Sequence, residues 1–177
     1  VCAVALAAAI RPAAAAAVAT TVVESASGKA DYSQLYGNME PDEAEILQAE
    51  LDECLDMISW CGESVTRESL ADLKSTNRPA QVVKDVLETV SILIGQPETK
   101  WDRLKKIVST TPFVEKVQRL NVQQVTRDQF KKLRERLQHP DFDEELIKTV
   151  CVAVVPLAMW CRAMGVYLSK TKFKGGS

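Results

Sequence analysis

The stretch Cys-Val-Ala-Val-Val-Pro-Leu-Ala-Met-Trp-Cys-Arg-Ala-Met-Gly-Val-Tyr-Leu, residues 151–168, decides the fold of this chain. It is almost wholly apolar, yet it contains Pro156 and Arg162. Its length approaches that of a transmembrane helix, but a cation in its second half argues against a membrane span. A helix that is apolar on nearly every side is otherwise a core helix. The stretch therefore predicts a central helix that presents one cation, with the rest of the chain packed around it.

Charge is divided unevenly along the chain. Residues 1–77 carry 4 Lys and Arg against 13 Asp and Glu, a net charge of −9, whereas residues 78–177 carry 18 against 11, a net charge of +7. A basic half indicates an anionic partner: nucleic acid, an anionic membrane or an acidic protein surface. The aromatic residues of this half fall inside apolar stripes, which favours core packing over base stacking. An acidic protein surface is the favoured partner, and a basic helical module for nucleic acid or membrane is the alternative.

The sequence offers no recognisable catalytic or metal-binding constellation. It has one histidine, His139, and none of its five cysteines forms a CxxC pair, so no zinc site can be assembled at standard spacing. Phosphate-loop, GxSxG and HExxH motifs are also absent. We therefore expect a chain that is not an enzyme and has no cofactor, catalytic residue or metal site. We expect its cysteines to be reduced thiols packed as small apolar residues.

The N-terminal part of the chain divides into two segments. Residues 1–41 are first rich in Ala and Val and then polar, and we expect a disordered low-complexity segment and linker. Residues 42–76 are acidic, with helical periodicity in two overlapping heptad seams. The first seam is Leu47, Leu51, Cys54, Ile58, Cys61 and Val65, and the second is Leu51, Leu55, Ile58, Gly62 and Val65. Spacing alone fits a coiled-coil strand and an ordinary bundle helix equally well.

From residue 77 the pattern predicts short helices whose ends are marked by capping residues, glycine and proline. Pro79 is expected in the first turn of the first helix, and Gly95 is expected to end it. The next helices are expected over 99–109 and from Thr111 to about Leu120, then after a capping box at Thr126, after Asp141–Glu144, and from Pro156 to about Lys172. No stretch of 78–177 alternates like a strand. The fold class is therefore predicted to be all-α.

Residues 74–168 resemble the microtubule-binding domain at the tip of the dynein heavy-chain stalk. The matching pieces are Lys74-Ser75 with Pro79, Val83-Lys84 through Glu88 to Gly95, Trp101-Asp102, Phe113, Lys131 to Arg134, Pro140-Asp141-Phe142, and Met159 to Met164 with Tyr167. They occur in the family's order, and together they are specific. The Trp-Cys-Arg-Ala-Met run is more similar to axonemal than to cytoplasmic dyneins.

The resemblance implies a small globular bundle of about six short helices flanked by two antiparallel coiled-coil strands. Residues 42–76 are then the outgoing strand, 77–168 the microtubule-binding domain, and 169–177 the start of the returning strand followed by a flexible tail. Pro79 and Pro156 are expected at the junctions between coil and globule.

The resemblance also implies the function. The partner is tubulin, faced by the first, third and sixth helices of the globule, and the expected microtubule contacts are Lys84, Glu88, Lys116, Arg119 and Arg162. Sliding of the coil seam is expected to switch affinity with the nucleotide state of a motor ring, which belongs to the remainder of the heavy chain and would hold the ATPase. The expected location is the cytoplasm and cytoskeleton, with the ciliary axoneme favoured. Neither nucleic acid nor membrane is then an expected partner.

Overall fold

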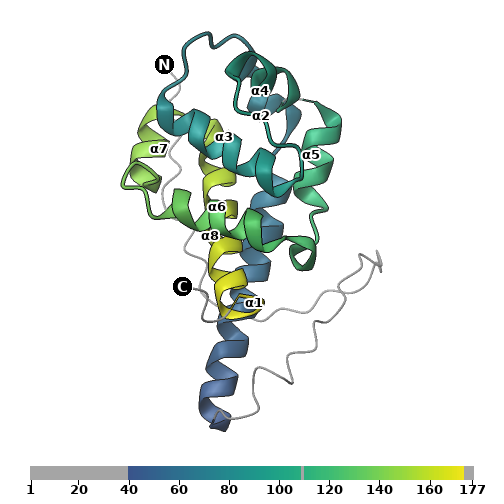
Figure 1. The fold of residues 1–177 in the computed structure, drawn as a ribbon, viewed down its shortest axis with the longest axis vertical. Coiled ribbons are helices and arrows are strands. Elements are labelled where there is room, and N and C mark those ends of the chain that lie inside the picture. Colours follow the sequence, from purple (N-terminus) through teal and green to yellow (C-terminus); the bar gives the residue numbers. More distant parts are fainter. Residues whose placement is uncertain (1–39, 109, 174–177) are drawn as a thin grey trace, which may run out of the picture. The chain divides into compact units, whose positions relative to one another are not determined.

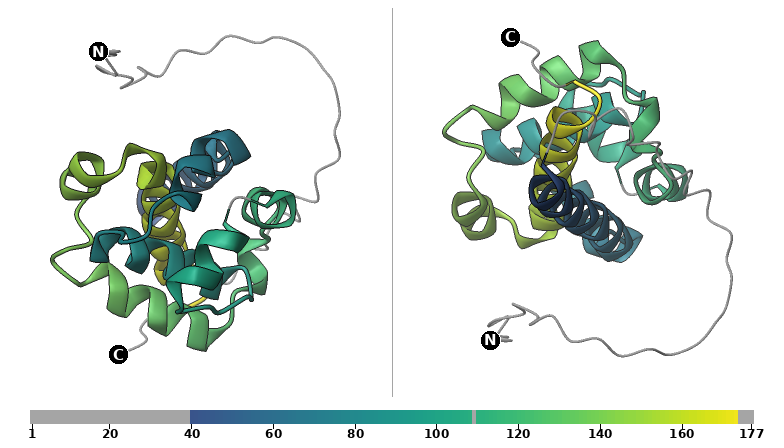
Figure 2. Two further views of the ribbon diagram at one scale, coloured as in Figure 1. Left: turned by 90° about the horizontal axis from the view of Figure 1, so that it is seen from above. Right: turned by 90° about the horizontal axis from the view of Figure 1, so that it is seen from below.

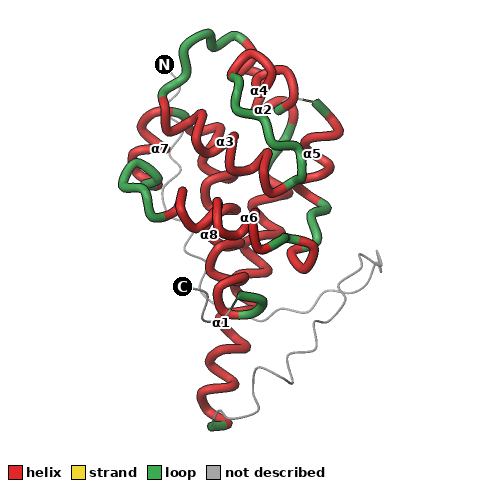
Figure 3. Tube along the Cα trace, in the orientation of Figure 1, coloured by secondary structure: helices red, strands yellow, loops and turns green. Residues whose placement is uncertain are grey.

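The computed structural model describes residues 40–108 and 110–173, and every regular element in these ranges is a helix (Figures 1 and 3). The α-helices are α1 (Pro41–Ser64), α2 (Arg67–Ala71), α3 (Gln81–Leu93), α4 (Trp101–Ile107), α5 (Thr111–Gln118), α6 (Arg127–Leu137), α7 (Glu144–Val150) and α8 (Val155–Lys170). The 3-10 helices are η2 (Asp72–Lys74), η3 (Val122–Gln124) and η4 (Val152–Val154). The all-α prediction is confirmed. Apart from its last two residues, the predicted linker 1–41 lies outside the described residues.

The central helix of the globule is α8. It contacts α1, α3, α6 and α7, and Figure 2 shows it running between them. Its side chains Leu157, Trp160, Met164 and Leu168 are fully buried. Among the described residues, Val152–Lys170 is long and apolar enough to cross a membrane, but its apolar sides are covered here by neighbouring helices. The predicted central core helix is therefore confirmed.

Helix α1 runs alongside α8, and its N-terminal turns extend beyond the globule (Figure 1). An ion pair between Lys170 at the end of α8 and Glu50 in α1 marks where the pairing ends. At the other end α1 stops at Ser64, because Val65 is extended with φ −83° and ψ 111°. The segment 42–76 is thus one long helix followed by two short ones, α2 and η2.

The helix ends predicted from Thr126, Gly95 and Pro156 are present in the structure. The Thr126 capping box of α6 is present, with both reciprocal hydrogen bonds to Gln129. Gly95 has a φ of 75°, a conformation suited to glycine, directly after the C-cap of α3. Pro156 lies in the first turn of α8, where the missing amide hydrogen costs nothing. These predictions are confirmed.

The expected position of Pro79 was wrong. Helix α3 begins at Gln81 and its N-cap is Ala80, which is extended at φ −61° and ψ 149°. Pro79 therefore lies before the helix, in the connection from η2. The buried stripe of α3 begins at Val82, directly after the first residue of the helix.

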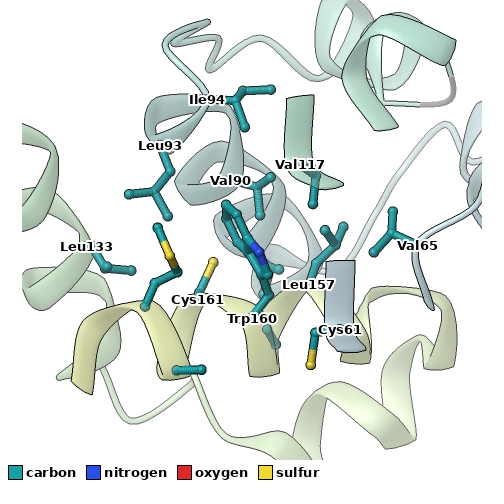
Figure 4. Close-up of a cluster of buried hydrophobic side chains, with 14 of the residues drawn as sticks. Cys61, Val65, Val90, Leu93, Ile94, Val117, Leu133, Leu157, Trp160 and Cys161 are labelled. Atoms are coloured by element: carbon teal, nitrogen blue, oxygen red, sulfur yellow. The ribbon is translucent and has the colours of Figure 1, made fainter. Parts of the chain in front are cut away.

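The core gathers around Trp160 of α8 (Figure 4). Cys61 of α1 and Cys161 of α8 are both free and buried in this cluster, which confirms that they pack as small apolar residues. The indole Nε1 of Trp160 is buried and has no hydrogen-bond partner among the described residues. A Cβ placed on Gly62 would lie 4.0 Å from that nitrogen, so α1 approaches the indole closely at this glycine.

Candidate functional site

Helix α3 turns an apolar face to the core and carries a charged edge beside it. Val83, Val86 and Val90 are buried because their helical spacing places them on one side. Lys84 lies next to this stripe with a 32% exposed side chain, and its Nζ is 3.4 Å from Oε1 of Glu88 one turn later. The predicted contact Lys84 is thus positioned by a rigid helix and by an ion pair to another predicted contact, Glu88.

Glu88 is not free to meet a partner in this structure. Its side chain is only 7% exposed, and Oε2 lies 3.1 Å from Nη2 of Arg136 in α6. Nη1 of the same guanidinium donates to Oδ1 of Asp85 at 3.0 Å, and Gln81 Nε2 donates to that oxygen at 2.9 Å. Arg136 therefore bridges both buried carboxylates of α3, an arrangement that buried charges require.

This bridge was not predicted from the sequence. Asp85 and Glu88 stand three residues apart at the edge of an apolar stripe, which signals a need for a cationic partner. Arg136, however, lies 48 residues beyond Glu88. It is one of five cations of α6, and the sequence does not distinguish which of them pairs with the carboxylates of α3. Only the packing of α6 against α3 selects one of them.

Arg162 is exposed on α8, although the residues on either side of it are buried. Its Nη2 donates to the carbonyl oxygen of Phe142 at 2.7 Å, in the connection between α6 and α7. This bond directs the guanidinium along the surface toward α7. Helix α8 contacts both α3 and α7, so Arg162 belongs to a helix packed against the one that carries Lys84.

The other two predicted contacts are Lys116 on α5 and Arg119, the C-cap residue of that helix. Lys116 and Arg119 are both exposed and line a surface pocket of about 370 Å³ that also includes Ile94 at the end of α3. Helix α5 packs on α1, and Gln118 Nε2 donates to the carbonyl oxygen of Val65 at 3.2 Å. Because of this contact, the position of α5 depends on the end of α1.

The predicted contacts thus fall into two sets. Lys84 and Glu88 form an ion pair on α3, and Arg162 extends from the adjacent α8. Lys116 and Arg119 form a second set on α5, and in the described ranges no hydrogen bond or ion pair links them to the first set. Of the two proline positions, Pro156 opens α8, while Pro79 sits in the connection leading to α3.

The seam between α1 and α8 combines the two predicted heptad patterns. Leu51, Ile58 and Val65, which the patterns share, are buried. Between them, Cys54 of the first seam and Leu55 of the second are both only half-buried against the core. Neither pattern is therefore completed at this level of the helix pair.

The buried cysteines of this seam have raised pKa values and low reactivity. Burial raises the pKa of Cys61 to about 11, with a smaller contribution from the nearby Glu144 carboxylate. Burial also raises the pKa of Cys161, to which the neighbouring Cys61 adds. Thiols with raised pKa values carry little thiolate at neutral pH and react slowly. Within the described residues, no group of three His, Cys, Asp or Glu side chains could hold a metal ion.

The described residues form an all-helical globule on a helix pair, with cations on α3, on α8, and on and directly after α5. The family described as the microtubule-binding stalk of dynein motor matches residues 40–169. This chain belongs to that family.

Individual relatives are dynein heavy chains of both cytoplasmic and axonemal kinds. Dynein axonemal heavy chain 2 of Homo sapiens is 30% identical over 105 residues, which cover 59% of this chain and 2% of the relative. Dynein axonemal heavy chain 3 of Mus musculus is 32% identical over 110 residues, which cover 54% of this chain and 3% of the relative. Cytoplasmic dynein 2 heavy chain 1 of Caenorhabditis elegans is 26% identical over 102 residues, which cover 56% of this chain and 2% of the relative. The chain therefore spans only a small part of the length of these relatives.

Proposed function

We propose that this chain binds microtubules as the stalk-tip part of a dynein heavy chain in the cytoskeleton, including the ciliary axoneme. The observation that carries the proposal is the placement of Lys84 and Arg162 on α3 and α8, which pack against each other, in a chain of the stalk family. Cations on a rigid frame suit an acidic protein surface, which they attract and orient through charge. Tubulin and the remainder of the heavy chain are the proposed partners, and the ATPase is proposed to lie outside this segment.

The proposed contacts differ in role. Lys84, Arg162, Lys116 and Arg119 are the proposed direct contacts because each is at least partly exposed. Glu88 is proposed to act indirectly: it is buried, and its carboxylate positions the Lys84 ammonium. Loss of Glu88 is thus expected to weaken binding through the orientation of Lys84.

Microtubule co-sedimentation tests this proposal. The double variant Lys84→Gln/Arg162→Gln removes two positive charges without placing a carboxylate beside Glu88. We expect it to pellet with roughly tenfold weaker affinity at low salt, and we expect binding by the parent to fall steeply as salt is raised. Lys132→Gln, which removes one charge outside the proposed site, is the control, because Lys132 is exposed on α6 and has no ion-pair partner among the described residues. Unchanged affinity in the double variant would contradict the site assignment.

We further propose that the register of α1 against α8 controls this affinity. The half-buried Cys54 and Leu55 support the proposal, since a packing that satisfies neither seam leaves an alternative of similar energy open. A shift of α1 would also reach α5, through its contact at Val65. The α5 cations would then move with the coil.

Cross-linking tests the register proposal. A short bifunctional maleimide joining cysteines introduced as Glu50→Cys and Lys170→Cys traps the observed register, because these residues form an ion pair. A second variant combines Ile46→Cys with Lys170→Cys. Residue 46 lies about one helical turn before residue 50, so this cross-link traps a register of α1 that is shifted by one turn. Cys2, Cys54 and Cys151 are replaced by serine in both. We expect the two cross-linked proteins to differ in microtubule affinity, and equal affinities would reject register control.

A basic module for nucleic acid or membrane remains the second candidate, favoured only by the net charge of +7 on residues 78–177. Oligonucleotides and vesicles containing phosphatidylserine are therefore assayed beside microtubules at the same salt. Tight, salt-sensitive binding to either one, without microtubule pelleting, would support this candidate over the first.

A further inference from the structure

The most basic helix of the chain, α6, lies outside the set of helices proposed to face the microtubule. Arg127, Lys131, Arg134 and Gln138 follow one another at intervals of four, three and four residues. Such spacing places them on one face of the helix. All four are exposed, and neither Arg127 nor Lys131 has an ion-pair partner in the described ranges. Arg127 and Lys131 are therefore available to an anionic partner.

This face borders a pocket of about 320 Å³. An aromatic pair lines it, because Phe173 stacks on Phe130 of α6 with ring centroids 4.7 Å apart. The chain leaves α8 after Lys170 to bring Phe173 there. Lys172 fixes this turn, since its Nζ donates to the carbonyl oxygens of Gln123 and Val125 at 2.7 and 2.8 Å. Two segments far apart in the sequence thus build one pocket.

We propose that this pocket docks an acidic peptide segment that carries one apolar side chain. The apolar side chain would lie against Phe130 and Phe173, and its flanking carboxylates would pair with Arg127, Lys131 and Arg134. Charge complementarity supports the partner, since three cations and two carboxylates of α6 line the pocket and leave it with a net positive charge. The pocket volume suits a single large side chain rather than a folded element.

The chemistry of the pocket favours a peptide over a nucleic acid. Asp128 and Glu135 also line it, where they can accept hydrogen bonds from peptide N–H groups, donors that a phosphate backbone does not have. The rings of Phe130 and Phe173 stack on each other, so each has one face occupied and unavailable for stacking on a base.

Fluorescence anisotropy with the full chain tests the proposal. The probe is a labelled oligoglutamate peptide with one central phenylalanine, and the comparison probes replace its glutamates by glutamine or its phenylalanine by alanine. We expect salt-sensitive binding of the first probe and at least about tenfold weaker binding of both others. The variant Arg127→Glu/Lys131→Glu is expected to lose about tenfold or more. Lys148→Glu, a single charge reversal at an exposed residue of α7, is expected to bind as the parent does.

A third variant, Phe173→Ala, separates the aromatic contribution from charge. It should bind the phenylalanine and alanine probes equally, with helical content by circular dichroism unchanged. The proposal is overturned if the parent does not bind the acidic probe at low salt, or if Arg127→Glu/Lys131→Glu binds it as tightly as Lys148→Glu. Tighter binding of an oligonucleotide through Arg127 and Lys131 would also overturn it. Microtubule pelleting of the same variant should match the parent, so failure of either proposal leaves the other measurable.

Discussion

The guanidinium of Arg136 in α6 lies 3.1 Å from the carboxylate of Glu88 in α3, and it also holds Asp85. The first prediction follows from this pairing. Arg136→Ala leaves the buried Asp85 without a cation and leaves Glu88 with Lys84 alone, so we expect a loss of about 2–4 kcal/mol in the free energy of unfolding. Urea denaturation measures it.

The double-mutant cycle with Glu88→Gln supplies the control. Arg136→Ala should cost less in the Glu88→Gln background, because residue 88 then carries no buried charge that needs Arg136. Equal costs in both backgrounds would mean that the ion pair contributes nothing.

Two helical glycines provide a second, matched prediction. A Cβ on Gly62 would meet its nearest neighbour, Cα of Gln118, at an ordinary 3.5 Å, whereas a Cβ on Gly165 would lie 2.4 Å from Cδ1 of Leu137. Gly62→Ala is therefore expected to stabilise the fold by up to about 1 kcal/mol through helix propensity. Gly165→Ala gains the same propensity but overpacks the contact between α6 and α8, and we expect a net loss of about 1 kcal/mol. Thermal unfolding of both variants should show shifts of opposite sign.

Gly95 gives a third prediction, based on backbone conformation alone. Its φ is 75°, and a Cβ at this position would have no neighbour within 4 Å. Gly95→Ala is expected to cost about 1–2 kcal/mol, because the left-handed conformation is unfavourable for alanine. Gly95→Asn should cost less, since asparagine tolerates this region better. A smaller loss for alanine than for asparagine, measured by urea denaturation, would show that α3 ends differently.

The buried thiols predict a pH dependence. The pKa of Cys61 is raised by burial from its ordinary value of 9.0 to about 11 in the folded protein. The pKa of Cys61 is higher in the folded protein than in the unfolded chain. The protonated thiol therefore contributes its full stabilisation below pH 9, and this contribution is lost as the pH rises through 11. The free energy of unfolding should thus fall more steeply between these pH values in the parent than in Cys61→Ala. Parallel slopes in urea titrations would contradict this.

Local sequence signals determined much of the fold. The apolar run 151–168 required burial of most of its side chains, which made α8 the core helix. Thr126, Gly95 and Pro156 act on their own backbone neighbours, so their effect on helix ends could be read without knowing the tertiary contacts. Cys61 was correctly expected in the core because it lies on a heptad seam.

The tertiary structure decided what depends on partners distant in the sequence. Arg136 could be chosen from the cations of α6 only once α6 lay against α3. Glu88, expected at the binding surface, became buried for the same reason. The pocket on α6 exists because Phe173 turns back onto Phe130. Sequence periodicity specifies which side of a helix is apolar, but pairing energies between distant side chains depend on distances that only the packed fold supplies.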